Sequence, residues 1–110
     1  MKVVVFAAAV EAAAGLALIV APSLVAWLLI GNDLSAPGAA VGRVAGFGLC
    51  GLALSRSTRG LLLYNMLAAI FFLYLGVRGE LVGVLLWPAF ALHGCLAALL
   101  ARLVIADTGR

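Results

Sequence analysis

Polar residues are confined to a few short stretches of this chain, and long apolar runs fill the space between them. The four longest runs cover about residues 3–21, 38–55, 60–77 and 81–105. Each run has about 18 to 25 residues, and a helix needs about 20 to cross the hydrocarbon core of a bilayer. The pattern therefore predicts four membrane-spanning helices.

The connections between the later runs are short, at residues 56–59 and 78–80. Short connections make consecutive helices antiparallel neighbours. We therefore expect an all-α fold in which residues 1–110 form one transmembrane domain, an up-down-up-down four-helix bundle. Residues 24–30 form an apolar segment after Pro22 that is too short to span. This segment predicts a helical extension of the first span or a short interfacial helix.

The first run also has some features of a cleaved signal peptide, because Lys2 precedes an apolar stretch and small residues lie at 12–14. However, Glu11 interrupts the apolar stretch, and cleavage would leave the hydrophobic residues 15–30 at the new terminus. An uncleaved first helix is the simpler prediction.

Composition supports a membrane protein, because the chain is 67% hydrophobic and only 10% charged, with a mean hydropathy of +1.31. Soluble chains average about 25% charged residues. The net charge of +3 comes from basic residues at the ends of the runs, without the basic patch and interleaved aromatics of nucleic-acid-binding proteins. We therefore expect membrane lipid, and no nucleic acid, as a partner.

The basic residues predict the orientation of the chain in the membrane. In the four-span arrangement, one side carries Lys2, Arg56, Arg59, Arg102 and Arg110. The other side carries Arg43 and Arg78. Basic residues accumulate on the cytoplasmic side, so both termini are expected in the cytoplasm. The aromatic residues expected near the outer interface are Trp27, Tyr74 and Trp87.

Polar residues that lie well inside the runs include Glu11, Arg43, Asn65 and His93. A charge at mid-bilayer costs at least about 2.5–3.5 kcal/mol, so each one requires an explanation. On helical wheels, each of the four shares a face with small residues. This predicts a bundle with a polar interior, in which Glu11, Arg43 and His93 form one buried cluster. The cluster is either a structural ion pair of Glu11 with Arg43 or a site for a ligand or proton. The alternatives are that Arg43 alone extends to the outer headgroups and that His93 is a hydrogen-bonded interior residue.

Small residues also predict where helices pack. Gly38, Gly42 and Gly46 lie four apart, and this doubled GxxxG pattern lets another helix approach closely. Cys50 and Cys95 lie in different runs, and we expect them to face different directions and to form no disulfide.

No catalytic triad, phosphate-binding loop or metal-spaced cluster occurs in the sequence, so nothing supports a catalytic assignment, and enzymatic activity stays open. A single histidine cannot supply both axial ligands of a haem. No cofactor is evident from the residues alone.

Three short segments carry a resemblance to a known family: Pro22-Ser23-Leu24-Val25, Leu28-Leu29-Ile30-Gly31 and Gly42-Arg43-Val44-Ala45-Gly46. With a glutamate in the first span and a histidine in the fourth, the chain resembles small bacterial membrane proteins of the DoxX-like type. The resemblance implies a four-helix bundle in the bacterial inner membrane. Some DoxX relatives are associated with quinone-linked oxidoreductase complexes, which implies a quinone or lipid ligand and other membrane subunits, or self-association, as partners.

A transporter is the alternative. Small multidrug resistance proteins also have about this length, four spans and a glutamate in the first span, similar in placement to Glu11. Three features depart from that family. Arg43 and His93 would lie in a cavity meant for cations, the third span lacks the expected tryptophan-containing pattern, and the strong charge asymmetry does not suit dual insertion.

Overall fold

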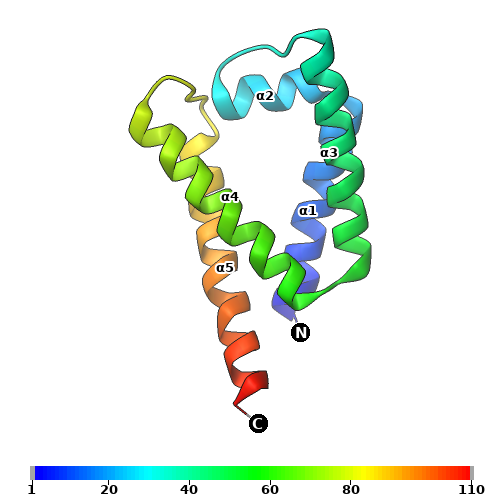
Figure 1. Ribbon diagram of the computed structural model, residues 1–110, viewed down its shortest axis with the longest axis vertical. Helices are drawn as coiled ribbons and strands as arrows, with labels where there is room; N and C mark the ends of the chain where they lie inside the picture. Colours follow the sequence, from blue (N-terminus) through cyan, green and yellow to red (C-terminus); the bar gives the residue numbers. More distant parts are fainter. Residues whose placement is uncertain (1, 110) are drawn as a thin grey trace.

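The computed structural model describes residues 2–109, which form five α-helices and no strand. The helices are α1 (Lys2–Val20), α2 (Pro22–Ile30), α3 (Ala36–Ser55), α4 (Thr58–Arg78) and α5 (Leu86–Thr108). The four long helices alternate in direction, and the short α2 lies across one end of the molecule (Figure 1). The prediction of an all-helical fold with a short helix after the first span is confirmed.

All four long helices are long and apolar enough to cross a membrane. Large apolar side chains lie on the outside, and Phe6, Phe47 and Phe71 are each more than half exposed. The buried face of α1 is instead made largely of small residues such as Ala7, Ala8 and Gly15. This distribution is unfavourable in water and suits hydrocarbon, where helices pack through small residues.

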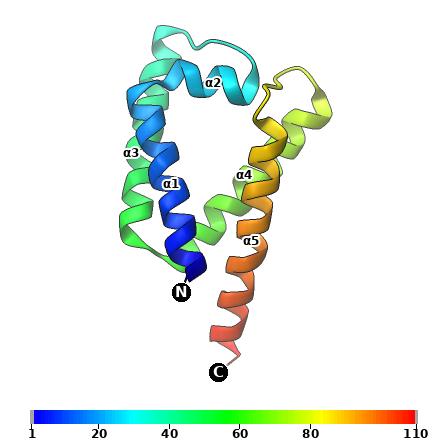
Figure 2. The same ribbon diagram turned by 180° about the vertical axis from the view of Figure 1, so that it is seen from behind.

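The four long helices form two closely packed pairs, α1 with α3 and α4 with α5, and the pairs make few contacts with one another. The pairs lie closest near the start of α1 and diverge toward α2 (Figures 1 and 2). One apolar core joins them at the close end. Its fully or almost fully buried members are Val4, Ala7, Leu61, Leu96 and Leu100.

A close approach of two glycines determines the packing of α1 on α3. A Cβ atom on Gly46 would lie 2.6 Å from the carbonyl oxygen of Gly15, and one on Gly15 would lie 2.8 Å from that of Gly46. Only glycine permits this separation of the two backbones. In the predicted stripe, Gly42 lies near Pro22, while Gly38 is close only to residues just before it in the chain, Leu34 and Ser35.

The last helix begins at Leu86 and not near residue 81 as predicted. The preceding residues 81–85 cross to the end of α2, where the N–H groups of Gly83 and Leu85 donate to the carbonyls of Leu29 and Leu28 at 2.9 and 2.8 Å. The last carbonyls of a helix have no partner within it. This apolar segment therefore supplies partners to α2, which hydropathy alone could not show.

Glycine makes the contact between these two segments possible. A Cβ atom on Gly83 would collide with the carbonyl of Leu28, and Gly31 ends α2 with a left-handed φ of 73°. The contact holds the far ends of the two helix pairs together.

The two cysteines, Cys50 on α3 and Cys95 on α5, are both free.

A buried cluster of Glu11, Asn65 and His93

Three polar side chains from three helices meet where the helix pairs approach one another. Glu11 lies on α1, Asn65 on α4 and His93 on α5. Glu11 and Asn65 are completely buried, and His93 is 7% exposed. The sequence predicted an inward orientation for each of them, and the structure brings them into direct contact.

Asn65 links the other two residues by hydrogen bonds. Its amide Nδ2 donates to Glu11 Oε2 at 3.2 Å and to the carbonyl oxygen of Leu61 at 2.8 Å. Its Oδ1 lies 2.6 Å from His93 Nδ1. A carbonyl only accepts, so the atom facing Leu61 must be the amide nitrogen. Asn65 Oδ1 therefore faces the histidine, and His93 Nδ1 carries the proton in this hydrogen bond.

Each cluster residue lies one helical turn from a member of the apolar core: Glu11 follows Ala7 by four residues, Asn65 follows Leu61 by four, and His93 precedes Leu96 by three. The cluster therefore lies directly on the core. Positions three or four apart share a helix face, so the packing of the apolar residues also aligns the polar ones.

One atom of the cluster has no partner. Glu11 Oε1 is buried and makes no hydrogen bond, and it lies 3.9 Å from His93 Nδ1. A buried polar atom without a partner costs about 1–3 kcal/mol. The carboxyl group therefore retains an unused capacity to accept a hydrogen bond or to hold a proton.

Aromatic rings of α4 surround the imidazole. Tyr64 lies edge-on to His93 with a centroid separation of 5.8 Å, and Phe72 lies 5.7 Å from it. His93 Nε2 has no hydrogen-bond partner among residues 2–109, and the His93 side chain is 9% exposed. The imidazole is therefore the part of the cluster that is not completely enclosed.

Arg43 does not join this cluster, and the prediction that it pairs with Glu11 is wrong for this structure. Its side chain is exposed, and Nε donates to the carbonyl oxygen of Ile19 at 3.0 Å. The Gly15–Gly46 contact between antiparallel helices places Arg43 level with Ile19. Ile19 lies about 12 Å along α1 from Glu11. The register of α1 on α3 thus separates two residues that share suitable faces.

Sequence reasoning missed Tyr64. It directly precedes Asn65, about 100° around the helix, so an argument from one helix face excluded it. Its proximity to His93 follows from the way α5 crosses α4. No group of three or more His, Cys, Asp or Glu residues within 2–109 is placed to hold a metal ion.

Comparison of the chain with protein-family models, with curated protein sequences and with solved structures gives no match. The resemblance to DoxX-like proteins therefore stays a prediction from short motifs.

Proposed function

We propose that this chain is an accessory protein of the bacterial inner membrane, of the DoxX-like type, that binds a small amphipathic molecule at the Glu11–Asn65–His93 cluster. One observation carries the proposal: a buried polar cluster lies within apolar helices, and its incompletely enclosed His93 imidazole has a nitrogen without a hydrogen-bond partner among residues 2–109. Polar groups within a membrane helix bundle are costly and typically mark a functional site.

The chemistry of the cluster favours a quinone or quinol as the ligand, with a lipid hydroxyl as the other candidate. With the proton on Nδ1, neutral His93 offers an Nε2 lone pair to a hydroxyl group. The protonated imidazole would instead donate from Nε2 to a ring carbonyl. Tyr64 and Phe72 offer aromatic surface beside it for a planar ring.

Retention of quinone during purification tests this proposal. We expect protein purified in mild detergent from bacterial membranes to retain quinone, measured by solvent extraction and mass spectrometry. His93→Phe keeps a ring in the same place but removes both nitrogens, and should lower retention at least about fivefold, because one hydrogen bond contributes about 1 kcal/mol.

Arg43→Gln is the matched control, because Arg43 is an exposed polar residue of the apolar helices outside the cluster. Equal retention by the wild type, His93→Phe and Arg43→Gln would show that quinone associates with the detergent micelle and not with the cluster.

The proposed orientation, with both termini in the cytoplasm, is supported by the positions of the basic residues. Lys2 begins α1, Arg56 and Arg59 lie where α3 passes into α4, and Arg102 lies in the last third of α5. These parts of the helices lie toward the end of the molecule with the N-terminus (Figure 1). The end with α2 carries Arg43 and Arg78, and Arg78 pairs there with Glu80 at 3.2 Å. Positive charge is thus concentrated at one end, as in the cytoplasmic ends of membrane proteins.

Reporter fusions test the orientation. A reporter fused after Arg110 should be active on the cytoplasmic side, and one inserted near Ser35, before α3, should be active on the outer side. The short α2–α3 connection can then lie in the outer interface. Detection of both reporters on one side would contradict three spans, α3, α4 and α5, between these positions.

The transporter alternative has less support. A proton-coupled exporter needs a membrane carboxylate that its substrate can reach, whereas Glu11 is completely enclosed and bonded to Asn65.

A further inference from the structure

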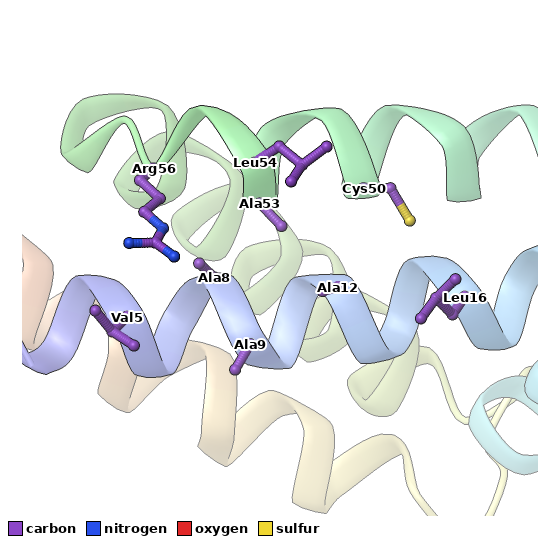
Figure 3. Close-up of a pocket in the computed structure, with 9 residues that line it drawn as sticks. All are labelled: Val5, Ala8, Ala9, Ala12, Leu16, Cys50, Ala53, Leu54 and Arg56. Atoms are coloured by element: carbon purple, nitrogen blue, oxygen red, sulfur yellow. The ribbon is translucent and has the colours of Figure 1, made fainter.

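A second feature lies on another face of α1. Between α1 and α3 runs an open groove of about 560 Å³ (Figure 3). Its α1 wall includes Val5, Ala9 and Leu16, and its α3 wall includes Leu54. The residues of α1 that line the groove between Val5 and Leu16 are alanines, and larger side chains there would fill the space. Glu11, Asn65 and His93 do not line it, so it is separate from the cluster.

One end of the groove carries a positive charge. Arg56, which ends α3, is the charged residue of its lining, and its guanidinium extends toward α1 beside Ala8 (Figure 3). This guanidinium makes no hydrogen bond or ion pair with the described residues. Arg56 also has a left-handed φ of 49°. The backbone there would suit glycine better, so local backbone stability does not explain an arginine.

The length of the groove matches one leaflet of a bilayer. The stretch from Val5 to Leu16 is about 16 Å long at 1.5 Å per residue. Half of the hydrocarbon core measures about 15 Å. Because Arg56 lies at the end with the termini, a lipid phosphate bound there would let an acyl chain follow the groove to the bilayer centre.

We propose that this groove binds one acyl chain of an anionic glycerophospholipid of the cytoplasmic leaflet, whose phosphate pairs with Arg56. The proposal rests on the membrane orientation given above but not on the ligand of the polar cluster. Charge favours a lipid over a second parallel copy of the chain. A parallel copy would place its own basic end beside Arg56, whereas a phosphate is complementary.

Native mass spectrometry tests the proposal. Protein is reconstituted in vesicles of equal parts phosphatidylglycerol and phosphatidylethanolamine and released into mild detergent. We expect the wild type to retain one phosphatidylglycerol in preference to phosphatidylethanolamine. Arg56→Gln should lower this retention about fivefold, because a basic residue near an anionic membrane surface contributes about 1 kcal/mol.

Matched controls separate the groove from general surface charge. Arg59→Gln removes the same charge from the first turn of α4, and Arg59 does not line the groove. This variant should therefore retain the lipid. Ala9→Leu should displace the acyl chain and lower retention of both lipids, whereas Ala13→Leu, an exposed position outside the groove, should not.

Stability is measured in parallel on Arg56→Gly. This variant suits the left-handed backbone, so it should melt no lower than the wild type while losing the lipid preference. Equal losses for Arg56→Gln and Arg59→Gln would overturn the proposal in favour of diffuse attraction. If the wild type forms dimers that Ala9→Leu disrupts, the groove binds a second copy of the chain and the lipid proposal is wrong. The same lipid measurement is made on His93→Phe. If this variant loses quinone but still binds the lipid, the groove and the polar cluster are independent sites.

Discussion

Replacing Asn65 by alanine is expected to lower the free energy of unfolding by about 2 kcal/mol. Asn65 bonds to Glu11, to the Leu61 carbonyl and to His93, and its removal leaves buried polar groups without partners. Such groups cost about 1–3 kcal/mol each in soluble proteins, but side-chain hydrogen bonds between membrane helices average only about 0.6 kcal/mol. Reversible unfolding in mixed detergent micelles measures the difference.

A double-mutant cycle shows whether the cluster acts as a unit. Glu11→Ala combined with Asn65→Ala should lose less stability than the sum of the single losses, because both remove the same bond. Glu11→Ala combined with Arg43→Ala should be additive within about 0.5 kcal/mol, because these residues have separate partners. Coupling of Glu11 with Arg43, and none with Asn65, would contradict the arrangement described above.

Replacing Gly46 by leucine is expected to separate α1 from α3 and to cost about 3 kcal/mol or more. Even a Cβ atom there would lie 2.6 Å from a backbone oxygen and 2.9 Å from a side-chain carbon of Ile19. Backbone cannot move aside as a flexible side chain can, so the helices must part. Overpacking typically costs 1–3 kcal/mol, and here it also breaks one of the two extensive helix–helix contacts of the fold.

Gly48→Leu is the matched control for this substitution. Gly48 lies on the same helix, and a Cβ atom there would meet nothing within 4 Å. Thermal unfolding in detergent should leave Gly48→Leu close to the wild type and lower the melting temperature of Gly46→Leu clearly. Similar losses for both variants would mean that leucine harms the helix itself and that the Gly15–Gly46 contact is unimportant.

The identity and approximate extent of the long helices could be predicted from the sequence, because hydropathy and length are properties of a continuous segment. The inward orientation of Glu11, Asn65 and His93 was predictable for a related reason. Each lies on a helix face of small residues, and the 3.6-residue period relates neighbours on that face. Arg43 met the same criterion and still lies elsewhere, since a helix face specifies direction but not depth.

Depth and distance depend on the register between helices, which only the tertiary structure decided. The contact of Gly15 with Gly46 places Arg43 beside Ile19 and away from Glu11. The crossing of α5 over α4 brings Tyr64 to His93, although Tyr64 is not on the Asn65 face. Residues 81–85 read as helix from their hydropathy, yet they leave the helix because the carbonyls of α2 need donors. In each case a long-range contact outweighs the local pattern. The sequence of one segment does not specify which other segment it will contact.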